Sequence, residues 1–136
     1  MELRADVWDR VMAFASQLAN EEQPEKYWAS HHALRDYCES QSLAGYDHPF
    51  LWETLADFTI DDSVAIPLYL RALDMASDDD MRDYRVSIRF ALAQRHQNQG
   101  ETDLARGYAI AADDEARHID DLELRRSISK FLLARE

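Results

Sequence analysis

The chain has 136 residues, of which 46% are hydrophobic and 31% charged, with only three glycines and three prolines. This balance is typical of a packed domain and excludes a disordered chain. A net charge of -12 would repel phosphates and anionic lipid headgroups, so we expect no nucleic acid and no membrane as partner. The charge favours encounter with a basic protein surface, although acidity often serves solubility alone. Without an apolar run of ~18 residues or a signal-like N-terminus, we expect a cytoplasmic protein.

The first 45 residues predict two helices. Apolar residues at steps of three or four predict a helix over about residues 2–20, with an inward face made of Leu3, Val7, Val11, Phe14 and Leu18. Pro24 suits the first turn of a second helix, which we expect to end near Gly45, where glycine permits a left-handed cap.

The segment 48–78 predicts a second helix pair. His48-Pro49 resembles a helix start, and the apolar residues from Phe50 to Phe58 supply the inward face of a short helix. We expect Ser63 to be the N-cap of the next helix, with Pro67 in its first turn; an earlier start would place a kink at Pro67.

Three further helices are predicted after the acidic break 77–80. The first carries Tyr84, Ile88 and Leu92 inward, and the turn around Gly100 separates it from a helix over about 102–117. Because this turn is short, the two helices should be antiparallel neighbours. A last helix over 119–136 would close the far end. Period-two alternation is too short for a sheet, so the sequence predicts an all-α fold of about seven helices.

Residues 89–112 resemble a tetratricopeptide (TPR) motif, a helix–turn–helix unit packed through alternating large and small residues. Leu92-Ala93 fits the large–small pair of the first helix, His96 falls where an aromatic is usual, and Gly100 marks the turn. Three alanines fit the close-contact positions of the second helix: Ala105, Ala109 and Ala112. The family prefers an aromatic at the position of Ala109.

A second, shorter copy extends from Trp52 to Leu73, with Leu55, Ala56, Ala65, Tyr69 and Ala72 at motif positions. The resemblance implies stacked antiparallel hairpins in a short right-handed solenoid. In this interpretation one domain, 1–136, contains a degenerate pair (1–45), a repeat-like pair (48–78), the best TPR match (81–117) and a capping helix with a polar outer face (119–136). A generic helical bundle using the same alanines is the alternative.

No residue pattern points to catalysis, a metal or a cofactor. Cys38 is the only cysteine, and the three glycines are isolated, which excludes a Gly-rich phosphate loop. Glu115 and His118 form one Glu-x-x-His step, whereas a di-iron bundle needs two such steps and further carboxylates. We therefore predict a non-enzymatic protein without a cofactor.

The TPR resemblance also implies a concave groove lined by the first helices of successive pairs. It places Glu53 and Asp57 on one of these helices, and Phe90, Gln94 and Asn98 on the next. Some TPR grooves clamp a terminal carboxylate with basic residues, which are absent here between residues 48 and 58. The two acids would repel such a carboxylate, so we expect the groove to prefer a basic or amphipathic protein segment.

Three functional classes remain open at this point. The first is a non-catalytic interaction module, an adaptor or chaperone-like scaffold. The second is an immunity protein or antitoxin that covers the active site of a toxin, which small size and acidity also suit. The third is a helical enzyme or regulator without a recognised motif. The partner and the oligomeric state stay open, although exposure of Trp8 or Trp28 would favour self-association.

Overall fold

A computed structural model describes residues 2–134 and confirms the all-α prediction within that range. One 3-10 turn, η1 (Asp79–Met81), accompanies seven α-helices: α1 (Ala5–Asn20), α2 (Pro24–Leu43), α3 (Pro49–Asp57), α4 (Asp62–Met75), α5 (Arg82–Asn98), α6 (Thr102–Ala116) and α7 (Leu122–Leu133). Between residues 2 and 134, no helix has the length and apolar character needed to cross a lipid bilayer.

Several predicted helix ends differ from the structure. Helix α1 begins at Ala5, and α7 occupies Leu122–Leu133. The last two residues of the predicted capping helix, 135–136, lie outside the described residues. Ser63 is not the N-cap of α4: the side chain of Asp61 accepts a hydrogen bond from the Ser63 backbone N–H at 2.9 Å. Helix α4 therefore starts earlier than predicted, and Pro67 lies inside it, beyond the first turn.

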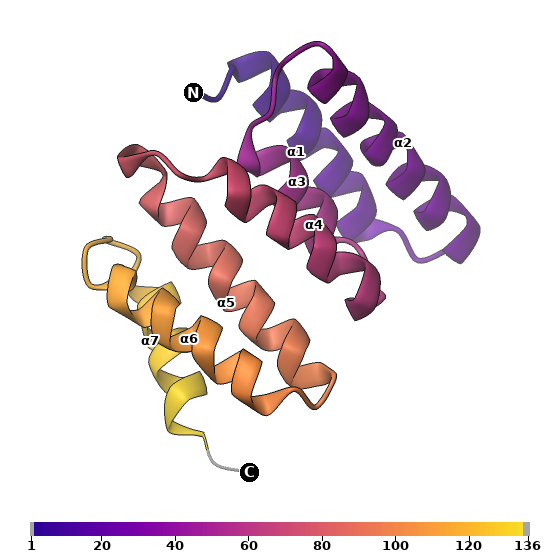
Figure 1. Cartoon of the computed structure of the whole chain (residues 1–136). Helices are drawn as coiled ribbons and strands as arrows, with labels where there is room; N and C mark the ends of the chain where they lie inside the picture. Colours follow the sequence, from indigo (N-terminus) through magenta and orange to yellow (C-terminus); the bar gives the residue numbers. More distant parts are fainter. Residues whose placement is uncertain (1, 135–136) are drawn as a thin grey trace.

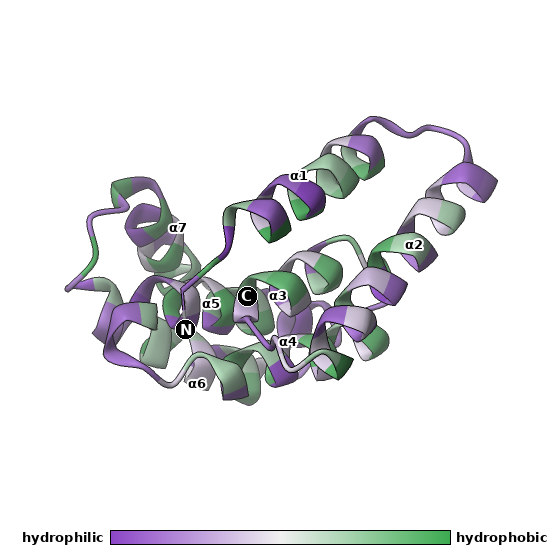
Figure 2. Cartoon of the chain, turned by 90° about the horizontal axis from the view of Figure 1, so that it is seen from above, coloured by the Kyte–Doolittle hydropathy of each residue, from purple (hydrophilic) through white to green (hydrophobic). Residues whose placement is uncertain are grey.

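The helix pairs α1/α2, α3/α4 and α5/α6 follow one another across the molecule (Figure 1). Helices α1 and α2 lie at one end and α6 and α7 at the other, and the connection from α1 to α2 is hydrophilic (Figure 2). Each helix contacts its neighbours in sequence, and α3 also contacts both α1 and α5. Helices α1, α3 and α5 thus lie side by side although none is adjacent in sequence to another.

Small residues bring these helices close together. All five alanines at second-helix motif positions are fully buried: Ala65, Ala72, Ala105, Ala109 and Ala112. Large residues of the first helices pack beside them, including Trp52, Leu55 and Leu92, which are at most 2% exposed. Because a methyl side chain leaves room for a neighbouring backbone, the alanines let α4 and α6 approach α3 and α5.

A charged cluster fastens α6 to α5 and to the turn before α5. Glu115 of α6 accepts hydrogen bonds from Arg85 Nε and Nη2 at 3.0 Å each, and it also pairs with Arg89 and Arg82. Arg85 donates further to the carbonyl oxygen of Ala76 at 2.9 Å. These hydrogen bonds and the nearby guanidinium groups lower the pKa of Glu115. The carboxylate therefore stabilises the α5–α6 hairpin in its ionised form.

We expect Glu115→Gln to lower the free energy of unfolding at pH 7 by about 1–3 kcal/mol, because three arginines lose their shared counter-ion. Since the folded-state pKa is lowered, this stabilisation exists above the unfolded-state pKa of about 4.3 and is lost as the pH falls below it. Urea unfolding at pH 7 and pH 3 measures both effects. Glu123→Gln, an exposed acid on α7, is the matched control; equal stability of the two variants at pH 7 would contradict the assignment.

Candidate functional site

A groove of about 370 Å³ opens on the face that α3 and α5 share, beside the start of α7. Its walls come from three separate parts of the chain: Phe50, Glu53, Thr54 and Asp57 of α3; Asp83, Tyr84 and Ser87 of α5; and Ile119 and Asp121 of the connection before α7, with Leu124 of α7 itself. The groove therefore exists only when all three helices are in place.

Helical periodicity explains why these residues face the groove together. The four residues of α3 follow one another at steps of three, one and three, so they share one side of the helix. The α5 residues Tyr84 and Ser87 are likewise about one turn apart. The side-chain hydroxyl of Thr54 donates to the carbonyl oxygen of Phe50 at 2.7 Å, which turns this polar group back onto its own helix.

The charge of the groove has one sign. Four of its ten lining residues are acids, namely Glu53, Asp57, Asp83 and Asp121, and none of the ten is basic. Asp121 also caps α7, because its side chain accepts a hydrogen bond from the Leu124 backbone N–H at 3.0 Å. Close carboxylates in a recess concentrate negative potential, which attracts cations and repels anions.

Glu53 is the most unusual acid of the groove. It is 8% exposed, and the Ser87 hydroxyl donates a hydrogen bond to its carboxyl oxygen at 2.5 Å. Desolvation is the main reason that its pKa rises to about 8, and this effect exceeds the opposing effect of the Ser87 hydrogen bond. At neutral pH the side chain of Glu53 is therefore mostly protonated.

Asp57 lies where the groove meets α4. The residue is exposed overall, but its carboxyl group lies among protein atoms, and this desolvation raises its pKa. The Tyr69 hydroxyl donates to it and opposes part of that effect. Burial of the Tyr69 ring and the nearby Asp57 charge in turn raise the pKa of the phenol. Asp57 is thus held in a fixed position by a neutral donor.

The structure separates the five residues that the TPR resemblance assigned to a groove. Glu53 and Asp57 line the cavity. Phe90 is 8% exposed and packs edge-on against Phe131 of α7, with ring centroids 5.7 Å apart, so it belongs to the core between α5, α6 and α7. Gln94 and Asn98 are exposed and lie outside the cavity.

Sequence reasoning missed the lining residues of α5 and α7. Ser87 precedes Gln94 by seven residues, which is two helical turns, so the same face of α5 continues from the cavity toward Gln94 and Asn98. That spacing was available from the sequence. Asp121 gave no comparable signal, because its place in the groove depends on how α7 packs against α5.

Comparison with known proteins adds no relative. No protein-family model, no curated protein and no solved structure matches the chain.

We expect the free energy of unfolding to depend on pH because Glu53 titrates at a different pH in the folded and unfolded states. Because its folded-state pKa is raised above the unfolded value of about 4.3, the folded state holds this proton more strongly, and stability falls as the pH rises from about 5 to 8. The loss is on the order of 1 kcal/mol per pH unit at most. Glu53→Gln mimics the protonated acid and should remove this component.

The measurement is urea unfolding of both proteins at pH 5, 7 and 9. The difference in unfolding free energy between variant and parent should move in favour of Glu53→Gln as the pH rises. A constant difference over that range would show that Glu53 titrates normally.

Proposed function

We propose that this chain is a non-catalytic protein-interaction module whose acidic groove binds a basic or amphipathic segment of a partner protein. The observation that carries the proposal is the composition of the groove, which combines four acids with Phe50, Tyr84 and Leu124 and contains no basic residue. A basic side chain would meet the carboxylates, and an apolar neighbour in the same segment would contact the rings.

The proposal includes a TPR-like arrangement, in which α3/α4 and α5/α6 are stacked hairpins and α1/α2 is a degenerate pair. Two observations support it. The large and small residues at motif positions are buried, and α3 contacts α1 and α5, which would be the first helices of the neighbouring pairs. In that arrangement the first helices line the concave face, and the groove between α3, α5 and α7 occupies that face.

Glu53 gives the groove a proton-linked response to its ligand. A guanidinium or ammonium group near the carboxyl favours the ionised form, so binding should release the proton that burial retains in the empty groove. The free protein avoids an uncompensated buried charge in this way. The bound state gains an additional ion pair.

Removing two groove charges should weaken binding. The variant Asp57→Asn with Asp83→Asn keeps the side-chain size and the oxygen that accepts from Tyr69. We expect its affinity for an arginine-containing amphipathic peptide to fall by about 1–2 kcal/mol, measured by fluorescence anisotropy at low salt.

The matched control removes the same charge elsewhere. Asp36→Asn with Asp74→Asn changes exposed acids on α2 and α4, outside the groove. The parent affinity should persist in this control. Equal weakening of the two variants would mean that overall charge, and not the groove, attracts the peptide.

The affinity for the same peptide should also rise with pH. Below the Glu53 pKa of about 8, binding must expel a proton, so the association constant should increase up to ~10-fold per pH unit from about pH 6 and level off above pH 8. Arginine stays charged throughout this range. Titration calorimetry in buffers of different ionisation enthalpy counts the released proton. A Glu53→Gln protein that retains the full pH dependence would contradict this role.

A further inference from the structure

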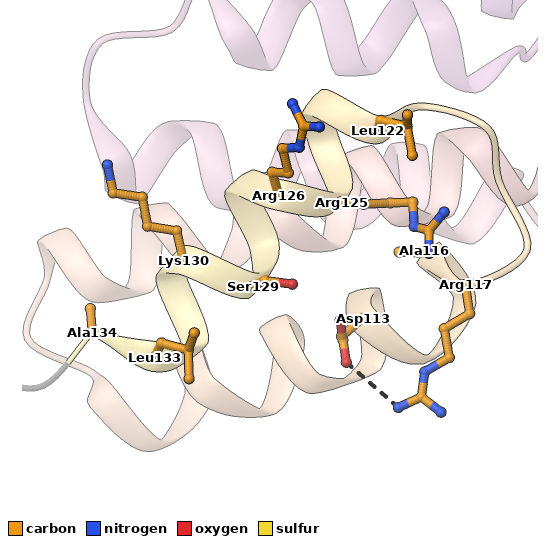
Figure 3. A pocket seen from close by; sticks show the side chains of 10 residues that line it. All are labelled: Asp113, Ala116, Arg117, Leu122, Arg125, Arg126, Ser129, Lys130, Leu133 and Ala134. Carbon is orange, nitrogen blue, oxygen red and sulfur yellow. Dashed lines mark ion pairs between the residues drawn. The ribbon is translucent and has the colours of Figure 1, made fainter.

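A second recess of the molecule is mainly basic. It has a volume of about 880 Å³ and lies between α7 and the C-terminal half of α6. Four of its lining residues are basic, Arg117, Arg125, Arg126 and Lys130, against the single acid Asp113. We call this surface the α6–α7 ledge (Figure 3).

The basic residues of α7 have no counter-ion in the described part of the chain. Arg125, Arg126 and Lys130 form no ion pair within residues 2–134, whereas Arg117 pairs weakly with Asp113 at 3.8 Å. The sequence as a whole carries 27 acids and 15 bases. Three such cations on one short helix of so acidic a protein create a local positive potential, which favours a ligand that carries acids.

The ledge is also apolar. Leu122 and Leu133, at the two ends of α7, are 56% and 80% exposed, and Ala116 of α6 also lines the recess. Figure 3 shows Arg125 and Ser129 directed toward α6, while Arg126 and Lys130 project from the other side of α7. Arg125 and Ser129 thus lie along α7 between the two exposed leucines.

The length and surroundings of the α6–α7 ledge suit a helix. Helix α7 has 12 residues, which is about 18 Å or three turns. Helices α3 and α5 are each packed against the helix that follows them, α4 and α6. A helix laid along α7 and α6 would cover Leu122 and Leu133 as α4 and α6 cover the helices before them.

We propose that the α6–α7 ledge is a docking site for an amphipathic helix of another protein whose apolar face is bordered by Glu and Asp. Its leucine-type side chains cover Leu122 and Leu133, and its acids pair with Arg125, Arg126 and Lys130. Nucleic acid fits less well, because a chain with net charge -12 repels a phosphate backbone outside this patch. The proposal is independent of the acidic groove, which selects the opposite charge.

The test uses the full chain and two labelled 18-residue peptides. Both carry leucines at i, i+3, i+4 and i+7 spacing; one has Glu at its charged positions and the other has Lys. Binding of the Glu peptide should weaken about 5- to 20-fold in Arg125→Ala with Arg126→Ala. The Lys peptide should bind that variant as it binds the parent. Raising NaCl from 50 to 300 mM should also weaken the Glu peptide.

The matched control is Lys26→Ala with Arg35→Ala, which removes two exposed charges from α2 at the other end of the molecule (Figure 1). It should bind the Glu peptide like the parent, and circular dichroism melting checks that all variants fold. Parent binding no stronger than to a scrambled Glu peptide, or equal loss in the control, would overturn the proposal.

A second copy of this chain is the competing occupant, because Trp8 and Met12 of α1 are 46% and 39% exposed and acids lie beside them. Sedimentation equilibrium distinguishes self-association from docking of a different protein. Self-association of the parent that Arg125→Ala with Arg126→Ala abolishes would overturn docking of a different protein, whereas a monomer that binds the Glu peptide would support it.

Discussion

Close contact between helices through buried alanines is the constraint on which the rest of the structure depends. Ala105, Ala109 and Ala112 form a fully buried stripe on α6, and Ala93 is fully buried on the facing helix α5. A larger side chain at any of these positions would have to move one helix away from the other, because a packed interior has no spare volume. The position of α7 rests on α5 and α6, so both the acidic groove and the α6–α7 ledge depend on the same contacts.

The two surfaces carry opposite charges. The groove contains acids without bases, whereas the ledge contains four bases and one acid. The arginines of α5 that pair with Glu115 form ion pairs within the chain, so those charges stabilise the contact between α5 and α6. If both proposals hold, the chain holds together a basic segment and an acidic helix, and each surface rejects the ligand of the other by repulsion.

Helix content could be predicted from the sequence because apolar residues recur at steps of three and four, and the buried stripe of α1 follows that pattern throughout. The TPR resemblance placed Glu53 and Asp57 on one helix face, and both line the cavity. It also placed Phe90 there, yet this ring packs on Phe131, since α7 covers that side of α5. The protonation of Glu53 could not be predicted from the sequence, because it follows from burial that only the assembled helices create.

The place where a basic segment binds decides whether the acidic groove is the binding surface. An NMR titration of the isotopically labelled chain with an arginine-containing amphipathic peptide locates that place without any substitution. The amide shifts should change on one face of α3, on the first turns of α5 and around the start of α7, and the Ser87 amide should move strongly. Changes confined to α2, α4 and α6 would contradict the assignment of the acidic groove as the binding surface.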